Sequence, residues 1–371
     1  MKIDTMIVVG EPDIKANIGT RNNALNEILN EYTRYANNVI YLGPGNYTYI
    51  KNNINHISVS GYSKSSRLIF KDTISVINRV KEVIKEHPNY HIQFRVPSLY
   101  TLQIYLIIRS ILDPKKISFY IAGDWEESLK YNYPDKKLLK LLPKLQSLVL
   151  RNKVCVFTGD TLLNKHRHII SRGHAIYSTT HKESDIKAPN VEESFNRRNI
   201  CFIGRTEKLK NPNFILRLAS SPELRDYQFF ILGDGPLKDQ LESKAKEKKT
   251  DNVIFTGHIN DRNRFNNILN SCKYYILPSY TEGTPKTLPE VMSKGILPIA
   301  FKNVGSNEYI LKNSGRLVDI DSTAQAIDFI KENDENFKVY KKNIDNVIKY
   351  ASEHSIEREF DSMFLFLSNA K

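Results

Sequence analysis

Two glutamates, Glu282 and Glu290, stand eight residues apart on either side of a Gly-Thr-Pro turn. The apolar run 274–279 precedes them and the segment 291–300 follows them, which predicts the order strand, loop, helix, strand. Pro289 fits a helix only within the first turn, so we expect the helix to begin just before it. Such a start leaves three backbone amides without helical partners, those of Lys286, Thr287 and Leu288.

A helix end of this kind attracts a phosphate group, because the helix dipole and the free N–H groups both favour an anion. Carboxylates beside an anion site suit a ligand whose phosphate is flanked by hydroxyl groups. A nucleotide sugar is such a ligand, with sugar hydroxyls on one side and ribose hydroxyls on the other. The other interpretation is that both glutamates are ordinary acids that complement the helix dipole. The pair by itself leaves both interpretations open.

Three upstream segments add to this pattern. Residues 199–212 predict a strand that ends in Gly-Arg, a loop that carries Lys210, and the start of a helix. A G-D-G-P motif at 233–236 and an F-x-G motif at 255–257 each follow an apolar run. The first glutamate belongs to a P-S-x-x-E-G motif at 278–283. In order and spacing, these motifs resemble the nucleotide-sugar half of the family 4 glycosyltransferases.

The resemblance covers residues 199–318 and implies the GT-B fold. That fold has two Rossmann-like, doubly wound α/β domains that face each other across a cleft, and a C-terminal helix that crosses back to the first domain. The resemblance also implies a retaining enzyme with no cofactor and no metal, since the nucleotide sugar is a substrate. Leaving-group charge on a diphosphate can be stabilised by fixed cations and helix amides instead.

Family roles carry over onto matching positions. The catalytic candidates are Arg205 and Lys210, as cations that hold the diphosphate, and Glu282, beside the transferred sugar. Glu290 is expected to accept from the ribose hydroxyls. Around these, the predicted donor site consists of Gly19, Arg205, Lys210, Gly233, Gly257, Gly283, Thr284, Lys286, Thr287, Leu288 and Glu290. The alternative for Arg205 is a surface residue at a strand end, and for Lys210 a solvated loop lysine.

The N-terminal half matches the family less closely. Only Gly19 stands where members usually carry paired glycines, and a glycine that merely starts a helix is the alternative. Arg95 follows a predicted strand, on a loop where many members place a histidine. Asp124 follows the next strand, where doubly wound folds bind ligands, although it can equally cap a helix. We predict Arg95 and Asp124 as acceptor-binding residues.

Alternating strands and helices over 371 residues predict an α/β protein of two domains. We expect an acceptor-binding domain at 1–180, a polar linker at 181–198, a nucleotide-sugar domain at 199–352 and a terminal helix at 353–371. Three cysteines without metal-ligand spacing indicate a reducing compartment, and neither a secretory signal nor a membrane-spanning run is present. We therefore expect a cytoplasmic protein.

The basic charge is concentrated in the first half. Residues 1–180 hold 25 lysines and arginines against 14 acids and so account for +11 of the net charge of +13. Within them, 136–153 alternates leucines and lysines at helical spacing, which suits the surface of an anionic membrane. The alternative is a domain helix whose leucines face the core and whose lysines are solvated.

We predict a retaining glycosyltransferase that moves a hexose-type sugar from a UDP-sugar to a saccharide acceptor. The acceptor is expected in lipid-linked glycan or surface polysaccharide synthesis, with peripheral contact to the inner face of the membrane. Two alternatives share the architecture: an enzyme like the UDP-N-acetylhexosamine 2-epimerases, and a non-catalytic nucleotide-sugar-binding protein. Nucleic acid is not an expected partner, because no aromatic-basic interleaving occurs. Asp319-Ile320-Asp321 mimics the D-x-D metal motif of another glycosyltransferase fold, but it lies near the C-terminus in a predicted turn.

Overall fold

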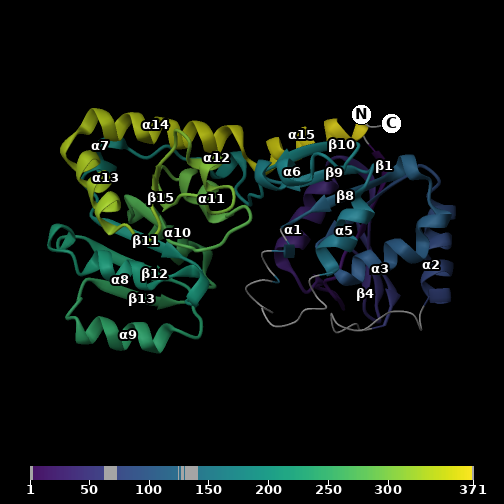
Figure 1. The fold of residues 1–371 in the computed structure, drawn as a ribbon, viewed down its shortest axis with the longest axis horizontal. Helices are drawn as coiled ribbons and strands as arrows, with labels where there is room; N and C mark the ends of the chain where they lie inside the picture. The colour runs from purple at the N-terminus through teal and green to yellow at the C-terminus, as the bar shows by residue number, and fades with distance from the viewer. Residues whose placement is uncertain (1–2, 62–72, 124, 127–128, 130–140, 370–371) are drawn as a thin grey trace. The chain divides into compact units, whose positions relative to one another are not determined.

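The protein is described from a computed structural model that covers residues 3–61, 73–123, 125–126, 129 and 141–369. The chain divides into two compact units (Figure 1). The N-terminal unit comprises Met1–Tyr177 and Glu359–Lys371, and the C-terminal unit comprises Ser178–Arg358. In the part of the chain that is described, no helix combines the length and the apolar character needed to cross a bilayer.

The N-terminal unit is built on an eight-stranded sheet in the order β10-β9-β8-β7-β1-β4-β6-β5. Its strands pair in parallel except β5, which runs antiparallel to β6. The strands are β1 (Ile3–Val9), β4 (Ala36–Pro44), β5 (Thr48–Lys51), β6 (Ile54–Ser60), β7 (Tyr90–Val96), β8 (Ile117–Ile121), β9 (Val154–Thr158) and β10 (Arg172–Ile176). A separate antiparallel pair is formed by β2 (Ile14–Lys15) and β3 (Gly19–Thr20).

Apolar strand residues and the inner faces of the helices form the core of this unit. The helices are α1 (Asn23–Tyr32), α2 (Thr73–Glu86), α3 (Leu99–Ile108), α5 (Leu142–Leu150), α6 (Asp160–His166) and α15 (Ile356–Ser368). Residues of α15 from Glu359 onward pack on the end of α1, where the rings of Tyr32 and Phe364 meet edge to face with centroids 5.1 Å apart. Tyr35, three residues after α1, stacks on Phe364 with ring centroids 4.5 Å apart. The expected terminal helix thus returns to the first sheet.

The C-terminal unit has a six-stranded, fully parallel sheet in the order β13-β12-β11-β14-β15-β16. The chain reverses its direction of winding between β11 and β14, which gives a doubly wound sheet with a switch point there. The strands are β11 (Asn199–Ile203), β12 (Gln228–Leu232), β13 (Val253–Gly257), β14 (Tyr274–Leu277), β15 (Leu297–Phe301) and β16 (Arg316–Val318).

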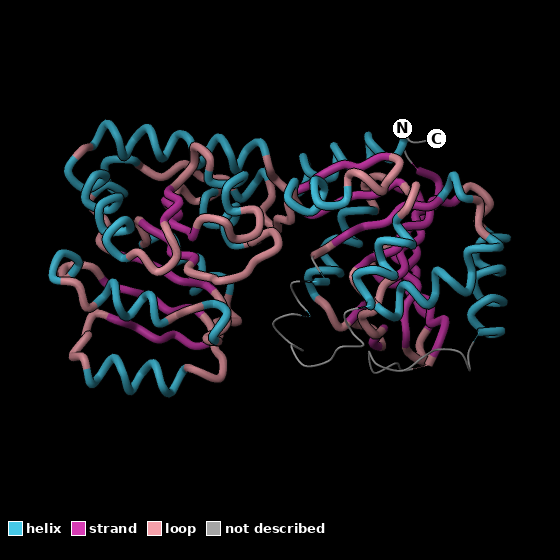
Figure 2. The backbone as a smooth tube through the Cα atoms, in the orientation of Figure 1, coloured by secondary structure: helices cyan, strands magenta, loops and turns pink. Residues whose placement is uncertain are grey.

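Helices flank this sheet on both sides (Figure 2). They are α7 (Val191–Phe195), α8 (Asn213–Ala219), α9 (Lys238–Glu247), α10 (Arg262–Ser271), α11 (Thr287–Met292), α12 (Asn307–Leu311), α13 (Thr323–Glu335) and α14 (Phe337–Glu353). The three cysteines are buried and free: Cys155 lies in β9, Cys201 lies in β11, and Cys272 directly follows α10.

The stretch 181–198, which we expected to be a linker, includes the short helix α7 and lies within the C-terminal unit. A buried lysine, Lys273, helps to hold this stretch against the C-terminal unit. Its fully buried ammonium lies 2.7 Å from the carbonyl oxygen of Phe195 at the end of α7 and 2.7 Å from an Asp334 carboxylate oxygen. Burial lowers the pKa of Lys273, while the Asp334 carboxylate opposes that change. A polar composition therefore did not predict an independent linker here.

Candidate active site

The predicted donor residues of the C-terminal unit follow four neighbouring strands. Arg205 follows β11, Gly233 follows β12, Gly257 ends β13, and Glu282 lies on the loop after β14. These strands are adjacent and parallel, so their carboxyl ends lie along one edge of the sheet. Ligands of doubly wound folds bind at that edge, beside the switch point. The fold therefore places residues up to 77 positions apart, Arg205 and Glu282, at one edge of the sheet.

Lys210 and Glu282 form an ion pair at this edge. The Lys210 Nζ lies 2.6 Å from the Glu282 Oε1, with side chains 28% and 11% exposed. Lys210 closes a short 3-10 turn, Lys208–Lys210, whose amide at Lys210 donates to the carbonyl oxygen of Glu207. An ammonium group has three N–H donors. Lys210 can therefore donate to Glu282 and to an oxygen of a bound ligand simultaneously.

The loop of Glu282 rests on the backbone near Gly305. A Cβ at Gly305 would lie 2.3 Å from the Glu282 carbonyl oxygen, and its φ is +53°. The Ser306 amide also donates to the Gly283 carbonyl oxygen over 3.0 Å. By contrast, a Cβ at Gly283 would meet no atom within 4 Å. Gly305 thus lets the two loops pack together, whereas Gly283 borders open space.

The second glutamate, Glu290, lies in the first turn of α11 and is 9% exposed. Its Oε1 accepts a hydrogen bond of 2.7 Å from Nη2 of Arg262, the first residue of α10. The Arg262 side chain is 63% exposed. No motif pointed to Arg262. Its only sequence signal is a place five residues after β13, close to where the carboxyl edge of the sheet was expected.

The helix α11 begins at Thr287, close to the position predicted from Pro289. The prediction of three amides without partners is wrong for Leu288, because its N–H donates to the Pro285 carbonyl oxygen over 3.3 Å. The tight turn that Pro285 introduces brings this carbonyl within reach. Thr287 contacts the strand below, where its hydroxyl and that of Tyr275 are 2.7 Å apart.

Arg205 takes a different position from Lys210. Its side chain is 71% exposed, and its Nε lies 3.6 Å from a carboxylate oxygen of Glu207. No hydrogen bond or ion pair among the described residues connects Arg205 to Lys210 or Glu282. The two predicted phosphate-binding cations therefore lie on the same loop without sharing a partner.

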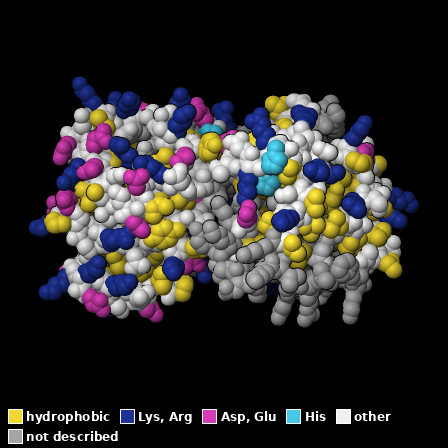
Figure 3. Space-filling view, viewed as in Figure 1, with side chains coloured by type: hydrophobic (Ala, Val, Ile, Leu, Met, Phe, Trp, Pro, Cys, Tyr) yellow, Lys and Arg dark blue, Asp and Glu magenta, His cyan; other side chains and the backbone are white. Residues whose placement is uncertain are grey.

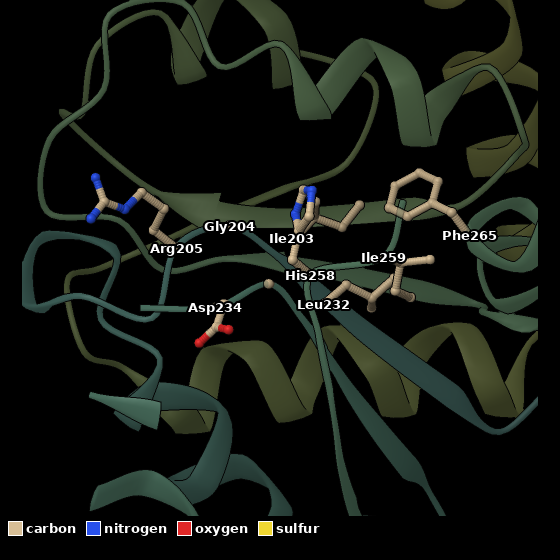
Figure 4. A pocket seen from close by; sticks show the side chains of 9 residues that line it. Ile203, Gly204, Arg205, Leu232, Asp234, His258, Ile259 and Phe265 are labelled. Atoms are coloured by element: carbon tan, nitrogen blue, oxygen red, sulfur yellow. The ribbon is translucent and has the colours of Figure 1, made fainter. Parts of the chain in front are cut away.

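A pocket of about 360 Å³ opens at the same edge of the sheet. It is lined by Ile203, Gly204, Arg205, Leu232, Gly233, Asp234, His258, Ile259 and Phe265. Figure 4 shows Phe265 and Ile259 at one end of this pocket, His258 in the middle, and the Arg205 guanidinium and Asp234 carboxylate at the other end. The pocket thus has an apolar end and a charged end. His258, Ile259 and Phe265 were not predicted from the sequence, although the first two directly follow the F-x-G motif.

Gly233 has a packing role in the wall of this pocket. Its φ is +145°, and a Cβ there would lie 2.0 Å from the Gly204 carbonyl oxygen. Its amide donates to the Gly257 carbonyl oxygen over 3.0 Å. These two predicted glycines therefore meet each other, and their contact holds the ends of β12 and β13 together.

The remaining predicted residues belong to the N-terminal unit. The Gly19 amide donates to the Tyr49 hydroxyl over 2.7 Å, so the fold itself uses this N–H. Arg95 was expected on a loop, but it is the next-to-last residue of β7, where it pairs with Tyr120 of β8. Its guanidinium lies over the ring of Tyr120, 4.1 Å from the centroid, and its Nη1 is buried without a hydrogen-bond partner among the described residues. Asp124 lies outside the described residues.

Comparison with known proteins places this site in a family. Residues 184–353 match the family described as glycosyl transferases group 1. This segment belongs to the group 1 glycosyltransferases. The matched segment contains Arg205, Lys210, Glu282, Glu290 and the pocket. The glycosyltransferase domain therefore holds every site element described above at the carboxyl edge of the second sheet.

Two relatives and one solved structure show how far the similarity extends. Protein CapJ of Staphylococcus aureus is 26% identical over 271 residues, which are 70% of this chain and 67% of CapJ. An Escherichia coli protein named UDP-Gal:alpha-D-GlcNAc-diphosphoundecaprenol alpha-1,3-galactosyltransferase is 30% identical over 209 residues, which are 53% of this chain and 49% of that protein. HepE of Anabaena, solved in complex with UDP, matches over 100% of both chains with a TM-score of 0.72 at 12% identity.

The chain thus spans about half to two thirds of the length of these two sequence relatives. The predicted family and the enzyme class that it names, glycosyltransferase, are confirmed for residues 184–353, and the GT-B fold is confirmed by the structural match. The roles of individual residues in this glycosyltransferase domain stay predictions.

Proposed function

We propose that this protein transfers a hexose-type sugar, with retention of anomeric configuration, from a UDP-sugar to a saccharide acceptor. The observation that supports this most is the Lys210–Glu282 pair, 2.6 Å long, at the carboxyl edge of a group 1 glycosyltransferase domain. A cation and a carboxylate in contact can act on neighbouring parts of one ligand. The ammonium donates to an oxygen of the leaving diphosphate, and the carboxylate accepts from a sugar hydroxyl.

The nucleotide is assigned to the 360 Å³ pocket. Its apolar end, with Ile259 and Phe265, suits a flat base, and Arg205 at the charged end suits the diphosphate. Glu290, fixed by Arg262, is assigned to the ribose hydroxyls. Uridine is favoured as the nucleoside because the E. coli relative is named for UDP-Gal and HepE was solved with UDP.

In the proposed transfer, the bond between the anomeric carbon and the diphosphate oxygen breaks. The acceptor hydroxyl oxygen bonds to that carbon on the same face, and its proton is taken up by the departing diphosphate. Negative charge grows on the diphosphate as the bond breaks, so preorganised cations lower the barrier. We assign this role to Lys210 and Arg205, with no metal ion required.

The acceptor is proposed to be a lipid-linked glycan. The name of the E. coli relative contains a diphosphoundecaprenol-linked sugar. The N-terminal unit also has the means to approach an anionic surface: on the face of it that Figure 3 displays, hydrophobic side chains gather over α3 and α5 among lysines and arginines. Leu141, directly before α5, is 58% exposed, and Leu148, in the last turn of α5, is 68% exposed. Leu145 lies between them and packs on the core. α5 therefore has a leucine on the core, as expected of a domain helix, and exposed leucines, as expected of a membrane-facing segment. Residues 136–140 of that segment lie outside the described residues.

The test is a transfer assay with a panel of UDP-, GDP- and dTDP-sugars and an undecaprenyl-diphosphate-linked sugar as acceptor. The expected result is a product one sugar longer, formed from one UDP-sugar and shown by NMR to keep the donor's anomeric configuration. A product formed from UDP-N-acetylhexosamine without any acceptor would instead indicate a 2-epimerase. Saturable UDP-sugar binding without turnover on any acceptor would indicate a binding protein.

Membrane contact is tested separately with vesicles of phosphatidylcholine alone and with added phosphatidylglycerol. We expect binding only to the anionic vesicles, weakened by salt because screening reduces the attraction. The variant Leu148→Ser should weaken binding, whereas Ile74→Ser, at an exposed position on α2, serves as the matched control. Equal binding to both kinds of vesicle would remove this part of the proposal.

A further inference from the structure

Asp321, in the turn between β16 and α13, receives three side-chain donors from other parts of the C-terminal unit. Its Oδ1 accepts from Asn211 Nδ2 over 3.0 Å and also from Nη2 of Arg217. Its Oδ2 accepts from the Tyr280 hydroxyl over 2.9 Å. These donors lie between 41 and 110 positions away along the chain. One carboxylate therefore connects three distant segments.

Two of these donors adjoin the proposed catalytic pair. Asn211 directly follows Lys210, and Tyr280 precedes Glu282 by two residues. A backbone hydrogen bond of 2.9 Å, from the Tyr280 amide to the Leu209 carbonyl oxygen, joins the same two loops. Asp321 thus binds one residue on each of the loops that present the ammonium and the carboxylate. We call Asn211, Tyr280 and Asp321 the loop clamp.

The backbone at the clamp requires such support. Asn211 has a φ of +48° and Asp321 a φ of +64°, the left-handed region that non-glycine residues seldom adopt. Asn211 is also buried, at 5% exposure, so its amide needs a hydrogen-bond partner. Burial by itself raises the pKa of Asp321, but the donors from Arg217, Asn211 and Tyr280 outweigh this effect and lower it. The carboxylate therefore stays charged and holds its donors.

The neighbouring acid has different partners, which argues against a shared metal site. Asp319 lies 3.0 Å from the Lys302 ammonium and accepts from Gln325 Nε2 over 2.6 Å. Neither partner belongs to the loops of Lys210 or Glu282. Asp319 and Asp321 thus bind different partners, and of the two only Asp321 contacts the loops of Lys210 and Glu282.

We propose that Asp321 is a positioning residue for the sugar transfer, which fixes the Lys210 loop and the Glu282 loop relative to each other. This proposal rests on the proposed function, because it assigns importance to the separation of those two side chains. The alternative is a purely structural carboxylate that connects α8, through Arg217, to the turn at 319–322.

The two alternatives differ in kinetics. If the clamp positions Lys210 against a charge that develops only as the bond breaks, its loss lowers kcat and leaves the donor KM nearly unchanged. For Asp321→Ala we expect a fall in kcat of about 10- to 100-fold, since a displacement of about 1 Å can cost that much. A structural role predicts a lower melting temperature and an unchanged kcat for the protein that stays folded.

Matched variants sharpen the test. Asp319→Ala removes the acid two residues away and should leave kcat within about twofold of the wild type, because it breaks no contact to either loop. Tyr280→Phe removes only the hydroxyl that donates to Asp321 and should lower kcat in the same sense. Combined with Asp321→Ala it should add little, since residues that act as one unit are not additive. If Asp321→Ala fails to fold, Tyr280→Phe carries the test by itself.

A readout that does not depend on turnover separates this proposal from the proposed function. Amide hydrogen exchange should rise together in 206–212 and 279–284 of Asp321→Ala, and stay unchanged in Asp319→Ala. A wild type that transfers no sugar while Asp321→Ala still loosens both loops would sink the proposed function and keep the clamp. An Asp321→Ala variant that matches Asp319→Ala in exchange and in kcat would overturn the clamp.

Discussion

At the scale of single residues, the two predicted acids of the site each have a basic partner, and the two partners differ in residue type and in exposure. Glu282 pairs with the half-buried Lys210, which was predicted for a phosphate, and Glu290 pairs with the exposed Arg262, which was not predicted at all. An isolated carboxylate with little exposure is costly, so each pairing offsets that cost and holds its acid in one place. Both acids can then accept from hydroxyls.

The Lys210–Glu282 pair leads to the first prediction. Lys210→Ala should lower kcat by about 100- to 1,000-fold, because a preorganised donor to the leaving group is lost. Glu282→Ala should lower kcat to a similar degree. The control is Lys208→Ala in the same 3-10 turn. Turnover is measured with a saturating donor, and melting curves check that each variant is folded. Turnover near that of the wild type in either site variant would contradict the assignment.

Arg262 leads to the second prediction. Arg262→Ala should raise the donor KM by roughly three- to tenfold with kcat nearly constant, because Glu290 loses the donor that orients it toward the ribose. Arg264→Ala, at an exposed position on the same helix α10, should change neither constant. UDP binding measured by calorimetry should show the same loss. An unchanged affinity for UDP would remove Arg262 and Glu290 from the donor site.

At the scale of elements, the site depends on how loops at the carboxyl edge pack on one another. The loop after β15 supports the loop after β14 through Gly305, and the end of β12 contacts the end of β11 through Gly233. These contacts involve backbone atoms, so they leave no trace in hydrophobic periodicity. They nevertheless decide where Glu282 and the pocket lie.

Gly305 leads to the third prediction. Gly305→Ala should displace the Glu282 loop, because the new Cβ meets the Glu282 carbonyl oxygen and φ is positive. We expect a stability loss of about 1–3 kcal/mol and a fall in kcat of at least about tenfold. Gly61→Ala is the control, since a Cβ there meets nothing within 4 Å. Urea unfolding and steady-state kinetics measure the two effects. A variant that loses stability but keeps its full kcat would show that the loop position tolerates the change.

At the scale of the whole molecule, the chain passes between its units twice, near residues 177 and 358, and the adjoining segments are joined within the C-terminal unit. The Ile356 amide donates to the His181 carbonyl oxygen over 3.0 Å. Arg358 Nε lies 3.1 Å from a carboxylate oxygen of Glu183. The His181 ring bridges Thr179 and the Ala351 carbonyl oxygen, the latter at 2.8 Å. The two segments therefore hold each other in place.

His181 leads to the fourth prediction. Burial lowers its pKa, although the Ala351 carbonyl and nearby acids oppose the change. The unfolded chain therefore binds a proton more readily than the folded one, and stability falls as pH drops below the unfolded pKa of about 6.5. Between pH 7.5 and 5.5, His181→Gln should reduce the slope of the unfolding free energy against pH by up to about 1.4 kcal/mol per pH unit. A profile for His181→Gln as steep as that of the wild type would contradict this prediction.

Much of the fold and part of the site follow from local pattern. The helix start near Pro289, the loop that carries Arg205 and Lys210, and the doubly wound α/β class all depend on spacing within short segments. Backbone rules act over a few residues, so a single sequence expresses them. The expected free amide at Leu288 and the linker at 181–198 failed because a turn carbonyl and a buried lysine from another segment supplied the partners.

What the sequence by itself determined was therefore the chemistry available: two acids, two cations and the strand ends that present them. Only the tertiary structure decided the partners. Strand order brings the loops after β11 and β14 together, so Lys210 meets Glu282, and it brings the turn after β16 within reach of both through Asp321. Contacts between residues 41 to 110 positions apart depend on how the strands are ordered and wound, which no local spacing encodes.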